Sequence, residues 1–160
     1  MSIATSVLDT TGFIRAAGDV RKDKGRTPKR MPMPAEVISM VRGGIPLDTR
    51  KQGETGGLPT EHDIYLQLLE LGLSATKAQM RTEKTVVFTT KELAIPNTTE
   101  YVLWTPKDIE ASVNEVLEEY NAYLESQMLK KIAGYQPIMC ALVRRGLVHA
   151  PIKNLVIDYE

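Results

Sequence analysis

The stretch TPKDIEASVNEVLEEYNAYLESQMLKKI, residues 105–132, carries the strongest structural signal in the chain. Thr105 suits an N-cap, Pro106 suits the first helical position, and Gly134 follows as a helix stop. Apolar residues between these signals recur at spacings of three, four or one, which predicts one long helix over about 106–133. Its single apolar stripe consists of Ile109, Val113, Val116, Leu117, Tyr120, Leu124, Met128 and Ile132.

The length of this predicted helix bears on its surroundings. At about 1.5 Å per residue the helix would be roughly 40 Å long. That length exceeds what one domain of this size needs for its own core. We therefore expect part of the stripe to contact another protein chain. The residues expected in that contact are Tyr120, Tyr123, Leu124 and Met128.

The segments around the long helix predict a helix-dominated α+β fold. Residues 136–145 form a nearly all-apolar run, opened by Pro137 and closed by Gly146, which indicates a buried C-terminal helix. Residues 85–89, 100–104 and 152–159 are rich in β-branched and aromatic side chains, which favours three strands of a small antiparallel sheet. Together with residues 61–83 these segments would form a compact domain over 61–160.

Residues 1–60 are expected to form an N-terminal arm with short helices over about 10–22 and 35–43 and a long polar loop over 45–60. Within the arm, residues 20–34 read VRKDKGRTPKRMPMP. Three prolines and a glycine predict that this segment has no regular element of its own. Its six cations are Arg21, Lys22, Lys24, Arg26, Lys29 and Arg30.

The net charge of the chain is zero, but the charge is segregated. Residues 1–60 hold ten Lys and Arg against six Asp and Glu, whereas residues 61–130 hold six against twelve. The basic arm is therefore expected to dock on the acidic middle of a neighbouring copy. Two other interpretations stay open, namely non-specific binding of nucleic-acid phosphates and a solvated linker.

Residues 61–83 resemble a helix-turn-helix in outline. A helix over about 61–71 would be broken at Gly72, and Ser74 would cap a second helix over about 75–83. The second helix would expose residues that can reach base edges and phosphates, although the acidic neighbours would repel DNA and an ordinary helical corner is the other interpretation. The candidate DNA-reading residues are Thr76, Lys77, Gln79 and Arg81.

Catalytic, metal and cofactor signals are not evident in the sequence. Cys140 is the single cysteine and lies in the apolar run PIMCALV, where a small buried hydrophobe is expected. His62 and His149 have no ligand-type residue at helical spacing, and no hydrolase, kinase or dinucleotide motif is present. No cofactor is therefore expected, and an enzyme with an unfamiliar site is a minor alternative.

No apolar run approaches the roughly 20 residues that span a bilayer, and the first residues lack the pattern of a signal peptide. Synthesis in the cytoplasm is expected. The sequence favours a non-catalytic structural or adaptor subunit of a homomeric or mixed assembly. In its arm and glycine-rich loop it is similar in style to virion components such as head–tail connector or coat subunits, so incorporation into a virion is one expectation. The alternative is a helix-turn-helix DNA-binding regulator or packaging factor reading DNA with residues 74–81.

Overall fold

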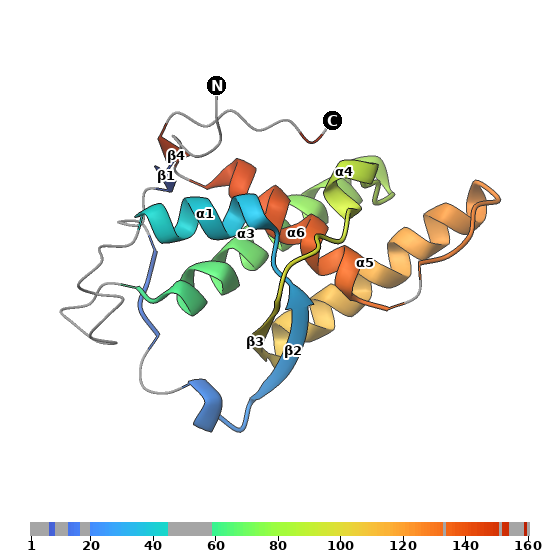
Figure 1. Ribbon diagram of the computed structural model, residues 1–160. Coiled ribbons are helices and arrows are strands. Elements are labelled where there is room, and N and C mark those ends of the chain that lie inside the picture. The colour runs from blue at the N-terminus through green and yellow to red at the C-terminus, as the bar shows by residue number, and fades with distance from the viewer. Residues whose placement is uncertain are drawn as a thin grey trace.

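The computed structural model describes residues 7–8, 13–16, 20–44, 59–132, 134–150, 152–153 and 159. The predicted fold class is confirmed, because helices dominate and the sheets are small and antiparallel (Figure 1). The elements in chain order are β1 (Val7–Leu8), the 3-10 turn η3 (Val20–Lys22), β2 (Arg26–Pro32), α1 (Ala35–Gly44), α3 (Glu61–Glu83), α4 (Thr90–Leu93), β3 (Glu100–Pro106), α5 (Lys107–Ser126), α6 (Gln136–His149) and β4 (Ile152–Lys153).

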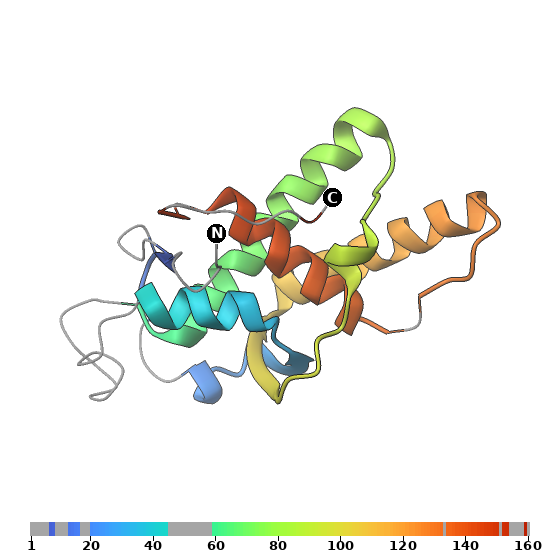
Figure 2. The same ribbon diagram turned by 45° about the horizontal axis from the view of Figure 1, so that its top comes forward.

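Helices α3 and α6 cross at the centre of the molecule (Figure 2), and two glycines allow their backbones to touch. A Cβ atom on Gly72 would lie 1.8 Å from the carbonyl oxygen of Leu142, and one on Gly146 would lie 1.8 Å from that of Leu68. The predicted helix break at Gly72 and helix end at Gly146 are therefore wrong. Both helices continue through their glycine, which serves close packing of one backbone against the other.

Helix α3 begins at Glu61, where the helix predicted over 61–71 begins. The side-chain oxygen of Thr60 accepts a hydrogen bond from the Asp63 amide, and the Asp63 carboxylate accepts one from the Thr60 amide. This reciprocal capping box satisfies two amides that a helix N-terminus would otherwise leave unpaired. From this start α3 runs for 23 residues as one helix, so no helix-turn-helix is formed.

The basic segment contains a strand, so the prediction of an irregular arm is wrong for Arg26–Pro32. This strand, β2, pairs antiparallel with β3, with Pro28 opposite Trp104. The Trp104 amide donates to His62, and the Arg30 carbonyl accepts from Tyr135, so the backbone groups at these positions point away from the partner strand. The prolines of β2 share this outward orientation. They remove no ladder hydrogen bond, and the strand tolerates them.

Three other expectations are corrected. Residues 85–89 form an extended connection and no strand, and α4 follows them with its own capping box between Thr89 and Glu92. In the predicted helix over 10–22, residues 13–16 are not helical, residues 20–22 form the short turn η3, and residues 10–12 and 17–19 lie outside the described residues. Of the predicted strand over 152–159, residues 152–153 pair with β1, residues 154–158 lie outside the described residues, and Tyr159 is not in a strand. The helix over 35–43 and the strand over 100–104 are confirmed as α1 and β3, whereas residues 45–58 of the predicted loop lie outside the described residues.

Helix α5 ends earlier than predicted. It covers 20 residues, about 30 Å, and Thr105 belongs to β3 and does not cap it. After Ser126 the chain turns back through Met128, whose φ angle is 58°. The side-chain amide of Asn121 then binds both backbone groups of Ile132, accepting from its amide at 2.8 Å and donating to its carbonyl at 3.1 Å. This clasp holds the returning segment beside α5.

One core joins the elements. Buried side chains of β2, α1, α3, β3, α5 and α6 form a single cluster, with residues on both sides of position 60. Among the helices of the described residues, none combines the length and the apolar character that crossing a membrane requires.

Candidate interaction surfaces

The cations of the basic segment are divided between solvent and the fold. Arg21, Lys22, Lys24 and Arg30 are exposed. Arg26 donates to the Trp104 carbonyl at 3.1 Å and lies 3.4 Å from the Asp23 carboxylate. Lys29 lies 3.7 Å from Glu110 of α5 and stands over the Tyr135 ring, 4.9 Å from its centroid. Part of the positive charge is therefore matched within the same chain.

The four residues predicted to contact another chain have different positions. Tyr120 and Leu124 are buried in the chain's own core, where Tyr120 packs edge-to-face on Phe88 at 5.1 Å. Tyr123 is half-buried and stacks on Tyr120. Met128 alone is fully at the surface, with 95% of its area exposed. The connection from α3 to α4 carries Phe88, so it covers a part of the stripe that seemed free in the sequence.

The candidate DNA-reading residues largely serve the fold. Thr76 is fully buried. Gln79 is half-buried, accepts a hydrogen bond from the Val87 amide at 3.3 Å, and joins Thr76 in accepting from Arg145. Lys77 donates to the Ser112 hydroxyl at 2.8 Å and lies 3.9 Å from Glu115. Of the four, only Arg81 is exposed.

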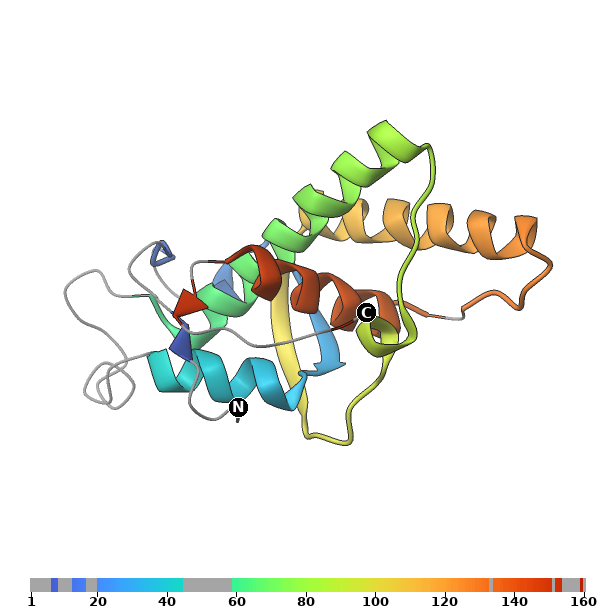
Figure 3. The ribbon, with the colours of Figure 1, turned by 90° about the horizontal axis from the view of Figure 1, so that it is seen from above.

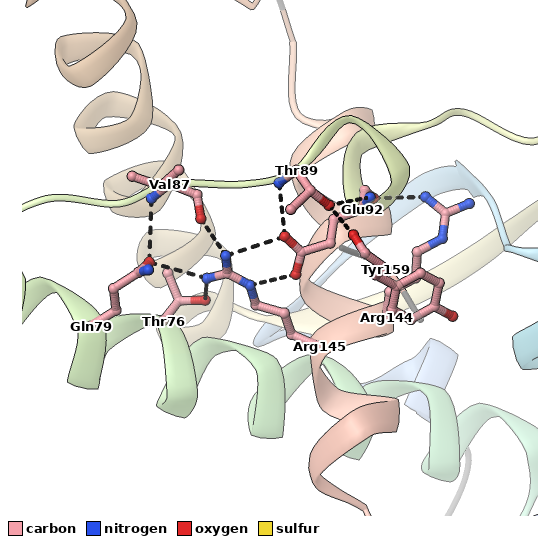
Figure 4. A network of polar contacts seen from close by, with 8 residues as sticks. All are labelled: Thr76, Gln79, Val87, Thr89, Glu92, Arg144, Arg145 and Tyr159. Atoms are coloured by element: carbon pink, nitrogen blue, oxygen red, sulfur yellow. Dashed lines mark hydrogen bonds and ion pairs between the residues drawn. The ribbon is translucent and has the colours of Figure 1, made fainter. Parts of the chain in front are cut away.

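Two neighbouring arginines of α6 organise a polar network that the sequence did not reveal (Figure 4). The guanidinium of Arg145 lies 2.7 Å from the Glu92 carboxylate and donates to Thr76, Gln79 and the Val87 carbonyl. It also stacks over Phe88, 4.2 Å from the ring centroid. These contacts fasten the connection between α3 and α4 to α6.

Arg144 holds helix α1 and the end of α4 against α6 in the same way. Its guanidinium pairs with Glu36 of α1 at 3.0 Å and donates to the carbonyls of Glu92 and Ala94, each at 2.6 Å. The Tyr159 hydroxyl donates to the same Glu36 carboxylate at 3.0 Å. The only signal in the sequence was a pair of adjacent arginines in an otherwise apolar helix, where each buried charge needs a partner.

The Cys140 thiol and the half-buried His62 imidazole each make a hydrogen bond to the backbone. Cys140 is fully buried, as predicted, its thiol donates to the Pro32 carbonyl at 3.4 Å, and burial raises its pKa to about 11. His62 accepts the Trp104 amide at its Nε2 atom, 2.9 Å away. Burial lowers the pKa of His62, opposed by the nearby Asp63 carboxylate and assisted by Arg26. Within the described part of the chain, no three His, Cys, Asp or Glu side chains converge as metal ligands.

His62 makes stability depend on pH. Because its folded pKa lies below the usual value of about 6.5, the unfolded chain binds the proton more tightly, and protonated Nε2 cannot accept the Trp104 amide. The free energy of unfolding should therefore fall as pH drops below about 6.5, by at most about 1.4 kcal/mol per pH unit for one proton. Urea melts from pH 7.5 to 5.0 measure this slope, which His62→Gln should flatten. An unchanged slope in the variant would contradict the assignment.

An open cleft of about 360 Å³ lies between the C-terminal end of α3 and the middle of α5. Lys77, Met80, Arg81 and Lys84 line its α3 side, and Glu115 lines its α5 side. The three cations are spaced at i, i+4 and i+7, so they share one face of the end of α3. Helix α5 continues beyond Glu115 with the exposed acids Glu118 and Glu119.

The turn that follows α5 forms a second exposed feature, which we call the hairpin tip (residues 126–132). It stands at the far end of a helix that projects from the core (Figure 3). Met128 is 95% exposed and the adjacent Leu129 is 56% exposed. Backbone hydrogen bonds fix the turn, including one of 2.8 Å from the Leu129 amide to the Leu124 carbonyl.

Comparison with protein-family models, with curated proteins and with solved structures finds no match to this chain.

Proposed function

We propose that this protein is a non-catalytic structural subunit of a larger homomeric assembly and that its hairpin tip contacts a neighbouring copy. The observation that carries the proposal is the exposure of Met128 and Leu129, side by side at the end of a projecting helix. Single exposed apolar residues are normal on protein surfaces. Two large ones at the outermost turn of a rigid element favour a contact surface.

The conformation of the tip supports this interpretation. A residue other than glycine with a positive φ angle costs of order 1–3 kcal/mol and persists where its surroundings determine it. Met128 has a φ angle of 58°, and the Asn121 clasp and the backbone bond of Leu129 hold the turn around it. A turn whose backbone is already held in place loses little backbone entropy on binding, so it suits an interface contact.

The basic segment contributes less to this proposal than a docking arm would. Its central residues are part of the β2–β3 ribbon, and Lys29 is matched by Glu110 of the same chain. The exposed Lys22, Lys24 and Arg30 remain available to orient an encounter between copies. A virion connector or coat is one assembly of this kind, and that assignment stays a prediction from the sequence.

The test replaces the apolar side chains of the hairpin tip and keeps the backbone conformation of the turn. Asparagine tolerates a positive φ angle, so Met128→Asn combined with Leu129→Asn removes the apolar side chains and retains the turn. Light scattering at tens of micromolar should show species larger than the 17.8 kDa monomer for the natural chain. The double variant should associate at least tenfold more weakly.

Ile95→Asn is the matched control, because Ile95 is also exposed but lies in the connection between α4 and β3. Its association should equal that of the natural chain. A natural chain that is monomeric throughout the concentration range, or a tip variant that associates normally, would refute the proposed function.

A further inference from the structure

The cleft between α3 and α5 has walls of opposite charge. Arg81 and Lys84 are exposed on the α3 wall, and neither takes part in an ion pair among the described residues. Glu118 and Glu119 are exposed on α5, and Glu119 lies one helical turn beyond Glu115, which lines the cleft. Among the described residues, Lys77 and Glu115 form the one ion pair across the cleft, at 3.9 Å.

The walls separate beyond that pair. Figures 2 and 3 show the C-terminal half of α3 and the C-terminal half of α5 projecting from the core and diverging. The unpaired cations and acids therefore lie on two arms of one open V. Met80, half-buried, provides an apolar contribution to the cleft.

We propose that this cleft binds a second copy of the chain in a two-fold symmetric contact. A two-fold axis perpendicular to the plane of the two arms, beyond the open end of the V, places the α3 wall of each copy against the α5 wall of the other. Arg81 and Lys84 of one copy then face Glu118 and Glu119 of its partner, and the reciprocal pairs form at the same time. The inference rests on the proposed assembly function and identifies one of the neighbours as a two-fold related copy.

The charges favour this occupant over nucleic acid. A phosphate backbone that approached the α3 cations would also meet Glu115 and the acids that follow it on α5, which repel it. A second copy offers each wall its complement. These charge pairs would lie at the solvent-exposed rim of the contact. They should therefore direct the orientation of the two copies, and the contact should weaken as the salt concentration rises.

Charge reversal tests the contact. The variant Arg81→Glu with Lys84→Glu makes both walls acidic, and the variant Glu118→Lys with Glu119→Lys makes both walls basic. Each variant alone should dimerise at least tenfold more weakly than the natural chain in sedimentation at 50 mM salt. An equimolar mixture should form a heterodimer, because each acidic wall then faces a basic wall.

Lys91→Glu with Lys107→Glu is the matched control, since it makes the same charge change at two exposed positions that do not line the cleft, in α4 and at the start of α5, and should leave dimerisation unchanged. Circular dichroism and thermal melts verify that all variants fold. Assemblies that persist in both reversed variants, with no gain on mixing, would overturn this inference and leave the hairpin-tip contact standing. Salt-sensitive binding of a 20-base-pair DNA duplex that Arg81→Glu with Lys84→Glu abolishes, without any effect on self-association, would overturn it as well. A natural chain that stays monomeric would refute the proposed function itself.

Discussion

Replacing Gly72 by alanine is expected to lower the free energy of unfolding by at least about 3 kcal/mol. The new Cβ atom would lie 1.8 Å from the Leu142 carbonyl oxygen and 2.6 Å from its carbonyl carbon. These are backbone atoms of α6, so no rotamer change can relieve the overlap, and the two helices must separate. For a chain of this size such a loss corresponds to a fall in Tm of roughly 10 °C.

The opposite side of the crossing supplies a second test. Gly146→Ala should cost a similar amount, because its Cβ atom would meet the Leu68 carbonyl in the same way. The double variant should lose less than the sum of the two, since helices separated by one methyl group leave room for the other. Ser74→Ala, at an exposed position of α3, is the control and should change stability by less than about 0.5 kcal/mol. A Gly72→Ala protein with the same Tm as the natural chain would contradict the close crossing of α3 and α6.

The second large effect is expected at Arg145. Arg145→Met keeps much of the side-chain length but leaves the buried Glu92 carboxylate without its cation. Breaking a buried pair in this way typically costs about 3–5 kcal/mol. The connection between α3 and α4 should be affected first, because Val87 and Phe88 both contact the lost guanidinium. Urea melts give the total loss, and amide hydrogen exchange of residues 86–93 locates it.

A double-mutant cycle separates the ion pair from the rest of the network. Glu92→Gln keeps a carbonyl oxygen that can accept the Thr89 amide, so the cap of α4 survives while the negative charge is removed. Adding Glu92→Gln to Arg145→Met should therefore recover about 1–3 kcal/mol of the loss. Strictly additive costs would mean that Arg145 acts through its packing on Phe88 and not through the carboxylate.

The sequence predicted the structure correctly where the signal depends on nearby residues. The helix start at residue 61, the apolar stripe of α5 from Ile109 to Leu124 and the buried Cys140 all depend on neighbouring residues in the chain, and each is found as predicted. The sequence alone could not predict the structural role of a residue where that role depends on a partner far away in the chain. Glycine permits a helix break and also a close helix crossing, and only the presence of Leu142 decides between them at Gly72.

The same reason explains the errors at the candidate surfaces. Proline usually excludes a strand, but Pro28 sits where the backbone of β2 points away from β3 and no hydrogen bond is required. Tyr120 has the pattern of an interface residue until Phe88, 32 positions earlier in the chain, covers it. Met128 remained at the surface because the chain turns back immediately before the stripe would have continued.

The crossing of α3 and α6 also constrains the order in which the protein acquires its structure. Residues 72 and 142, which touch through their backbones, are separated by seventy positions, so the contact closes a long loop. A growing polypeptide presents α3 well before α6 has been made. Until then the apolar face of α3, with Leu68 and Leu69, has no cover from its main partner. The yield of folded protein should therefore depend on how well this face is shielded during translation.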